Sequence, residues 1–260
     1  MIVTTSARAD EQTEQYAKHV ANILSSTYVT RKKQSVTSIQ SVYQSDVIVV
    51  GKGRIELFPY GEADPFFFHP NSAMFRLKRL VRNEHDPFIE VAQLQEGSSI
   101  LDCTLGLASD SVTASYVVGP TGRVVGIEGN PYIAFLVQKG LQDWDSGIQS
   151  MNEAMRRVEV ISGFAENFLK EQPDNSYDCV YFDPMFEESI VTSVGIKGLS
   201  KFAVYHEMTD HLVNEALRVA KRRVVLKDHY QSSRFQKFGF NVITRKSAKF
   251  HYGFLEKPRD

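Results

Sequence analysis

Short apolar runs alternate with amphipathic stretches along the chain from about residue 98 onward. Near-continuous apolar strands separated by helices are typical of a parallel sheet covered on both faces. The strands are predicted at Ser99–Cys103, Val124–Glu128, Val158–Ser162, Cys179–Asp183 and Arg223–Lys227. The clearest helices between them are predicted at Pro131–Gln142 and Tyr205–Ala220, and Phe240–Thr244 with Phe250–Leu255 predicts a closing antiparallel hairpin. We therefore expect an α/β fold with a doubly wound, mostly parallel, Rossmann-like sheet.

The first sixty residues follow another pattern. Ile2–Thr5 predicts a strand, a helix is expected from about Asp10, and Ser35–Tyr43 predicts a second helix. The runs Asp46–Val50 and Arg54–Phe58 enclose two glycines and predict a β-hairpin. We expect a small α+β domain over residues 1–60.

Residues 61–95 differ from both flanking segments. An aromatic run, Phe66–Phe68, is ended by His69 and Pro70, and the helix-like stretch Met74–Arg82 follows it with four basic residues. We interpret 61–95 as a connector, which leaves residues 96–260 for the larger domain.

Composition says more about the compartment in which the chain works than about its activity. Among 260 residues, 30 Lys and Arg nearly balance 31 Asp and Glu, so net charge favours no polyanionic partner. Basic residues cluster at 31–33, 76–82, 221–223 and 245–249 and could line a groove for phosphates. Cys103 and Cys179 lie in apolar runs, as reduced core thiols do, and no Cys/His cluster predicts a metal. With no apolar signal core and no membrane-length apolar run, we expect a cytoplasmic chain without membrane contact.

The first strand of the larger domain ends in an acidic, small-residue loop. Asp102 closes the strand and Gly106 lies in the turn, where backbone can approach a ligand closely. A dinucleotide site would need G-x-G-x-x-G, and this loop has one glycine. A carboxylate here suits an amine-bearing ligand, such as the amino-acid end of S-adenosyl-L-methionine, better than a pyrophosphate.

The next two strand ends fit the same ligand. Glu128 ends its strand about 20 residues after the first loop, where a carboxylate can accept hydrogen bonds from both ribose hydroxyls. The third strand is followed by Phe164 and Ala165, which could give an adenine ring an apolar wall and a backbone donor; a helix cap at Ser162 or Gly163 is an equal alternative.

The fourth strand carries the most specific signal, the sequence Asp183-Pro184-Met185-Phe186. It resembles the Asp/Asn-Pro-Pro-Tyr/Phe motif of methyltransferases that act on exocyclic or amide nitrogens. Such a nitrogen is a poor nucleophile because its lone pair is delocalised. The Asp183 carboxylate and the Pro184 carbonyl can accept both of its N–H bonds and orient it, and Phe186 can stack on a flipped-out base.

Four motifs together resemble one family. They are Asp102-x-Thr-x-Gly-x-Ala-x-Asp110, Glu128-x-Asn-Pro131, Asp183–Phe186 and the strand Arg222–Lys227. This combination is similar to the bacterial 16S ribosomal RNA guanine-N2 methyltransferases of the small-subunit methyltransferase J type, and it covers roughly residues 75–227. Ala108 stands where that family usually has glycine. Residues 1–60 and the closing hairpin are not clearly matched.

The resemblance implies a methyltransferase that uses S-adenosyl-L-methionine to methylate guanine N2 in small-subunit rRNA, free or in a ribosomal particle. It adds Thr104, Asp110 and Asn130 to the expected cofactor-binding residues. Asp183 would border both the cofactor and the target nitrogen.

Two other functions remain open at this point. One is a methyltransferase for a protein or small molecule, which the balanced net charge favours slightly. The other is a non-catalytic RNA-binding or assembly factor with an unused cleft. The sequence predicts no particular oligomeric state.

Overall fold

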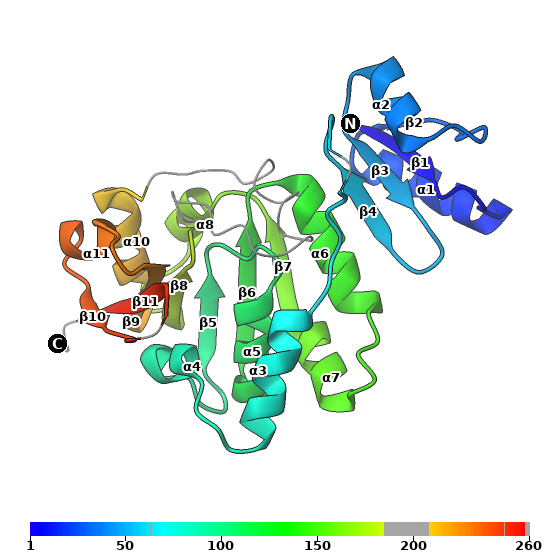
Figure 1. Cartoon of the computed structure of the whole chain (residues 1–260). Coiled ribbons are helices and arrows are strands. Elements are labelled where there is room, and N and C mark those ends of the chain that lie inside the picture. The colour runs from blue at the N-terminus through cyan, green and yellow to red at the C-terminus, as the bar shows by residue number, and fades with distance from the viewer. Residues whose placement is uncertain (63, 185–207, 247, 258–260) are drawn as a thin grey trace. The chain divides into compact units, whose positions relative to one another are not determined.

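The computed structural model describes residues 1–62, 64–184, 208–246 and 248–257. Within these ranges the chain forms two compact units, one ending at His69 and the other beginning at Pro70 (Figure 1).

The first unit is a four-stranded sheet with two helices. Its elements are β1 (Ile2–Thr5), α1 (Glu11–Ile23), β2 (Thr27–Tyr28), α2 (Val36–Tyr43), β3 (Val47–Val50) and β4 (Ile55–Phe58). The strand order is β2-β1-β3-β4, with β1 parallel to both neighbours and β4 antiparallel to β3. The Asp10 carboxylate caps α1 by accepting the Thr13 N–H at 2.9 Å. The two expected helices and the hairpin are therefore present.

The second unit is built on a seven-stranded sheet in the order β10-β11-β9-β8-β5-β6-β7. Its strands are β5 (Ser99–Asp102), β6 (Arg123–Glu128), β7 (Val158–Ser162), β8 (Tyr177–Phe182), β9 (Ala220–His229), β10 (Asn241–Ile243) and β11 (Phe250–Glu256). The β5–β9 strands are parallel to one another, and β11 is antiparallel to β9 and β10. This confirms the doubly wound sheet and its closing hairpin.

Helices cover both faces of this sheet. They are α3 (Asn71–Val81), α4 (Pro87–Ala92), α5 (Ser109–Val118), α6 (Pro131–Asp143), α7 (Gln149–Arg157), α8 (Ala165–Glu171), α10 (Asp210–Val219) and α11 (Arg234–Lys237). On β8, Val180 and Phe182 pack with residues of α8, α10 and α11. Tyr181, between them, points to the other face and lies 4.5 Å from Phe88 of α4, measured between ring centroids. Alternation along a strand thus gives the sheet two apolar faces.

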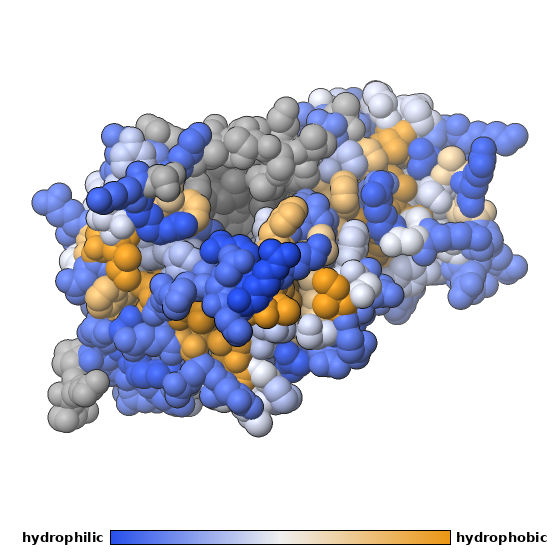
Figure 2. Space-filling model, turned by 60° about the horizontal axis from the view of Figure 1, so that its bottom comes forward, coloured by the Kyte–Doolittle hydropathy of each residue, from blue (hydrophilic) through white to orange (hydrophobic). Residues whose placement is uncertain are grey.

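The segment expected as a connector, residues 61–95, contains α3 and α4, and both belong to the second unit. Phe88 packs on the sheet, and Arg76 of α3 forms ion pairs inside this unit. Figure 2 shows hydrophilic side chains over most of one molecular face, with apolar ones in small separate groups.

Candidate active site

The loop after β5 is organised around the Asp102 carboxylate. One oxygen accepts the Thr104 N–H at 3.0 Å, and the other accepts the Ser111 hydroxyl at 2.7 Å. Asp102 is 2% exposed, and this burial raises its pKa to about 7. Both carboxylate oxygens therefore hold the turn and the start of α5.

Gly106 gives this loop an open backbone. Its φ of +50° is left-handed, and a Cβ added there would come no closer than 3.9 Å to another atom. Two residues on, Ala108 has a φ of +59°. That left-handed conformation explains physically why glycine suits this position in the resembled family.

Glu128 ends β6, the strand that pairs with β5. Its carboxylate accepts the Asn130 N–H at 2.9 Å, and burial raises its pKa. The Asn130 side chain caps α6 by accepting the Tyr132 and Ile133 N–H groups at 2.9 and 3.3 Å. Asn130 thus orients the helix, while Glu128 provides the carboxylate at the strand end.

Beyond β7 the chain turns at Gly163, where a Cβ would meet nothing within 4 Å. Phe164 follows as the residue before α8, and its ring is 39% exposed. Ala165 packs against the core beneath it. The open backbone at Gly163 and the exposed ring at Phe164 leave room for a flat apolar ligand at this strand end.

Asp183 follows β8 and is held at two atoms. Its N–H donates to the Thr104 hydroxyl at 2.6 Å, and its carboxylate accepts from the Lys227 ammonium at 2.6 Å. Burial raises the pKa of Asp183 to about 6, although the Lys227 charge acts to lower it. Thr104 therefore joins the first loop to the Asp183–Pro184 segment. Met185 and Phe186 lie outside the described residues.

Asp110 connects Lys227 to two further charged residues of the unit. It accepts from Lys227 at 3.3 Å, from the Tyr181 hydroxyl at 3.0 Å and from Arg76. Arg76 also pairs with Asp86 at 2.8 Å. We call Asp86, Arg76, Asp110, Lys227 and Asp183 the buried ion network.

Acidic and basic side chains alternate along this network, and each neighbour shifts the pKa of the next. Burial acts to raise the pKa of Asp110, but Lys227 and Arg76 overcome it and hold that pKa below its usual range. Burial acts to lower the pKa of Lys227, but Asp110 and Asp183 raise it. The network thus keeps a cation beside Asp183 and a carboxylate beneath that cation.

The sequence patterns predict no individual role for Lys227. Lys227 lies in the apolar strand β9, which neighbours β8 in the sheet. A lysine in that position marks a candidate partner for the Asp183 carboxylate, which follows β8. The sequence groups Arg76 with basic residues that could contact phosphates. In the structure its guanidinium instead forms ion pairs with Asp86 and Asp110.

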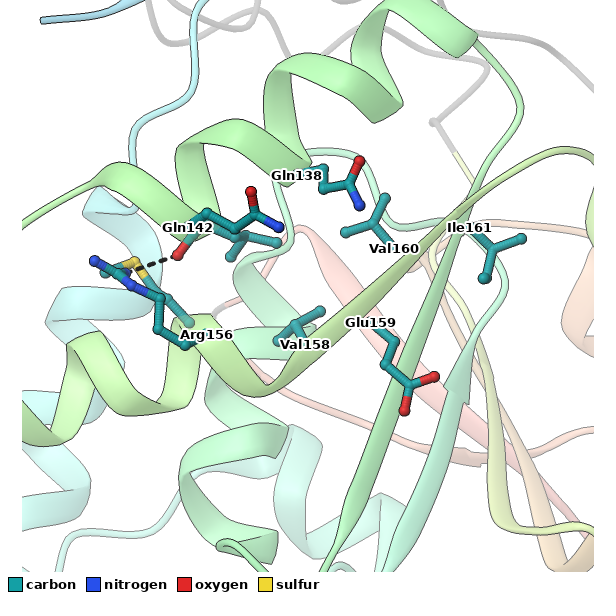
Figure 3. A pocket seen from close by; sticks show the side chains of 9 residues that line it. Gln138, Gln142, Arg156, Val158, Glu159, Val160 and Ile161 are labelled. Carbon is teal, nitrogen blue, oxygen red and sulfur yellow. Dashed lines mark hydrogen bonds between the residues drawn. The ribbon is translucent and has the colours of Figure 1, made fainter.

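A hollow of about 320 Å³ lies elsewhere, beside the edge strand β7 (Figure 3). Gln138 and Gln142 of α6, Arg156 of α7, and Glu159 and Ile161 of β7 line it. None of the predicted site residues contributes to it. Within the described residues, no group of His, Cys, Asp and Glu could hold a metal, and no helix is long and apolar enough to span a membrane.

The sheet order and the strand-end carboxylates fit an S-adenosylmethionine-dependent methyltransferase. A family model described as "Putative SAM-dependent methyltransferase" matches residues 64–251, and the chain belongs to that family. A crystal structure of the SAM-dependent methyltransferase NGO1261 from Neisseria gonorrhoeae has the same fold, with a TM-score of 0.66, 16% identity, and coverage of 99% of this chain and 96% of that one.

The chain is also similar to two proteins from other bacteria. It is 48% identical over 255 residues to "Uncharacterized protein YpiP" of Bacillus subtilis, covering 98% of this chain and 99% of that protein. It is also similar to "Ribosomal RNA small subunit methyltransferase J" of Coxiella burnetii, at 30% identity over 165 residues. That match covers 62% of this chain and 61% of the relative.

S-adenosyl-L-methionine is the cofactor of this chain, as its family shows. The residues present fit it chemically. Glu128 supplies an acceptor at the second strand end, Phe164 an exposed ring at the third, and Gly106 an open backbone at the first.

Proposed function

We propose that this methyltransferase methylates an exocyclic amine, guanine N2, of ribosomal RNA in the cytoplasm. The main observation in support of this proposal is the Asp183–Pro184 segment. Lys227 holds its carboxylate, and Thr104 holds its backbone. The similarity to ribosomal RNA small subunit methyltransferase J supports an rRNA substrate, free or within a small-subunit particle.

The bound cofactor supplies an electrophilic methyl group on a sulfonium, so the protein has to orient the nucleophile and take up a proton. The Asp183 carboxylate accepts one N–H of the amine, and the Pro184 carbonyl accepts the other. These two bonds aim the nitrogen lone pair. The new N–C bond would form as the S–CH3 bond of the cofactor breaks, which would release S-adenosylhomocysteine. The amine proton would pass to the Asp183 carboxylate, which with a pKa of about 6 is ionised at neutral pH.

Cofactor contacts in this proposal follow the strand ends. Asp102 shapes the loop that, with Gly106, receives the methionine part. Glu128 accepts from the ribose hydroxyls, and Phe164 with Ala165 borders the adenine. The catalytic domain in this proposal is the second unit, from Pro70 onward, since α3 contributes Arg76 to the buried ion network.

The first test is methyl transfer from labelled cofactor to 16S rRNA transcripts and to small ribosomal subunits lacking the modification. Nucleoside analysis should find N2-methylguanosine. Label that survives ribonuclease and stays with protein would instead indicate a protein methyltransferase.

Asp183→Ala tests the assignment of roles. Because Asp183 orients the amine, this variant should lose turnover by about 100-fold or more while still binding S-adenosylhomocysteine in calorimetry. Loss of cofactor binding in a folded Asp183→Ala protein would contradict the assignment.

A further inference from the structure

Lys227 links Asp183 to a cluster of rings that the proposed chemistry does not use. His229 ends β9 and pairs in register with Phe250, the first residue of β11. The Lys227 ammonium lies 2.6 Å from the Asp183 carboxylate and 5.1 Å from the centre of the Phe250 ring. The cluster is therefore one side chain away from the carboxylate that would hold the target amine.

Tyr230 is the exposed member of this cluster. Its ring lies 4.5 Å from that of His229 and 6.1 Å from that of His251, measured between centroids. Its N–H donates to the Lys249 carbonyl at 3.2 Å, which joins the two segments. The side chain is nevertheless 49% exposed. A ring backed by other rings but open to solvent is suited to stacking.

The turn that carries Tyr230 is fixed from below. The Asp228 carboxylate is 1% exposed and accepts from the His229 N–H and the Ser232 hydroxyl, both at 2.7 Å. It also accepts from the Arg234 guanidinium at 2.8 Å. Such a held turn loses little freedom on binding, so it is pre-organised for a partner.

Basic residues lie in the segment that pairs with the Tyr230 backbone, just before β11. The Arg245 guanidinium lies 4.8 Å from the centre of the Phe250 ring, and Lys246 and Lys249 are exposed beside it in the sequence. Two other basic residues of the second unit, Arg76 and Arg223, have partners within the protein. Arg76 lies in the buried ion network, and Arg223 is buried against Glu256.

We propose that Tyr230 stacks on an RNA base next to the target nucleotide, while Arg245, Lys246 and Lys249 contact the neighbouring phosphates. These four residues form what we call the stacking surface. The inference rests on the proposed function, since it assigns the RNA flanking the modified base to this end of the sheet. Base–aromatic stacking tolerates many sequences, so the surface holds the strand while Asp183 selects the amine.

The test compares RNA affinity with cofactor affinity in Tyr230→Ala, Tyr230→Phe and the control Tyr43→Ala. Tyr43 lies in the first unit and is 44% exposed, close to the value for Tyr230. Fluorescein-labelled fragments of 16S rRNA serve as the probe. Tyr230→Ala should bind them about 10-fold more weakly and raise KM, with kcat and S-adenosylhomocysteine binding unchanged. Tyr230→Phe and Tyr43→Ala should bind as the parent does.

Lys249→Gln adds an independent measurement. Removing one phosphate contact should lower the salt dependence of RNA binding by about one counterion. An unchanged salt slope would remove Lys249 from the surface.

The possible failures are distinguishable. Parental RNA affinity in Tyr230→Ala, or an equal loss in Tyr43→Ala, would overturn the stacking role and leave rRNA methylation intact. If the parent protein binds cofactor but neither binds nor methylates RNA, the proposed function itself fails, and the stacking role fails with it.

Discussion

The two halves of the large sheet hold their strand-end carboxylates in different ways. On the β5–β6 side, Asp102 and Glu128 accept only from N–H groups and two hydroxyls among the contacts described. On the β8–β9 side, Asp183 is paired with Lys227, which also pairs with Asp110. One half uses neutral donors and the other uses a partly buried cation.

The ligands proposed for each half account for this difference. The cofactor brings its own positive charges, an ammonium and a sulfonium, so its carboxylates need no resident cation. The guanine amine is neutral, and a buried carboxylate facing it needs a permanent counter-ion to stay ionised. Accordingly, burial raises the pKa of Asp102 to about 7 with no cation among the causes that oppose it.

The most severe test of this comparison is to remove the cation with Lys227→Met. It leaves Asp183 without its counter-ion, so unfolding free energy should fall by about 3–5 kcal/mol and turnover by about 100-fold. The pKa of Asp183, about 6 in the parent, should rise because the lowering effect of Lys227 is gone. Turnover requires the carboxylate, so its acid limb should move to higher pH in a pH–kcat profile.

Lys139→Met is the matched control. Lys139 forms an exposed pair with Asp143 at 3.1 Å, a kind of pair that contributes little to stability. Its pH profile should equal that of the parent. A folded Lys227→Met protein with an unshifted acid limb would show that Lys227 does not set the charge of Asp183.

Glu128→Gln probes the neutral half and should have a smaller effect. A glutamine can still accept the Asn130 N–H, so the fold should be kept, but charge-assisted bonds to ribose hydroxyls would be lost. We expect S-adenosylhomocysteine to bind about 10-fold more weakly in calorimetry, with kcat unchanged at saturating cofactor. Glu159→Gln, which alters an exposed pair with Arg123, should bind as the parent does. Parental affinity in Glu128→Gln would remove this residue from the ribose contact.

The same division explains what the sequence could predict. Asp102 and Glu128 are predictable because each ends an apolar strand. Two of their partners, Ser111 and Asn130, also follow them closely along the chain. The buried ion network joins Lys227 to Asp110 across 117 positions, and Arg76 to Asp110 across 34. A pattern of strands and loops identifies the elements that meet, but not which charged side chain on α3 turns inward. The sequence pattern does not single out Tyr230 either. Its exposure depends on a turn that the Asp228 side chain holds.

The prediction with the smallest expected effect tests whether a change in the neutral half leaves the charged half unaffected. A Cβ at Gly126 of β6 would lie 2.3 Å from Cδ1 of Leu105, which is 4% exposed in the first loop. In Gly126→Ala, Leu105 must rotate, which should lower unfolding free energy by about 1 kcal/mol in chemical denaturation. Cofactor affinity should fall slightly because the loop at Gly106 moves, whereas the pH–kcat profile set by Asp183 should not change.

Gly53→Ala, where a Cβ meets nothing within 4 Å, is the control. A shifted pH profile in Gly126→Ala would mean that the neutral and charged halves are coupled, with Thr104 as the connecting residue, because its hydroxyl accepts the Asp183 N–H.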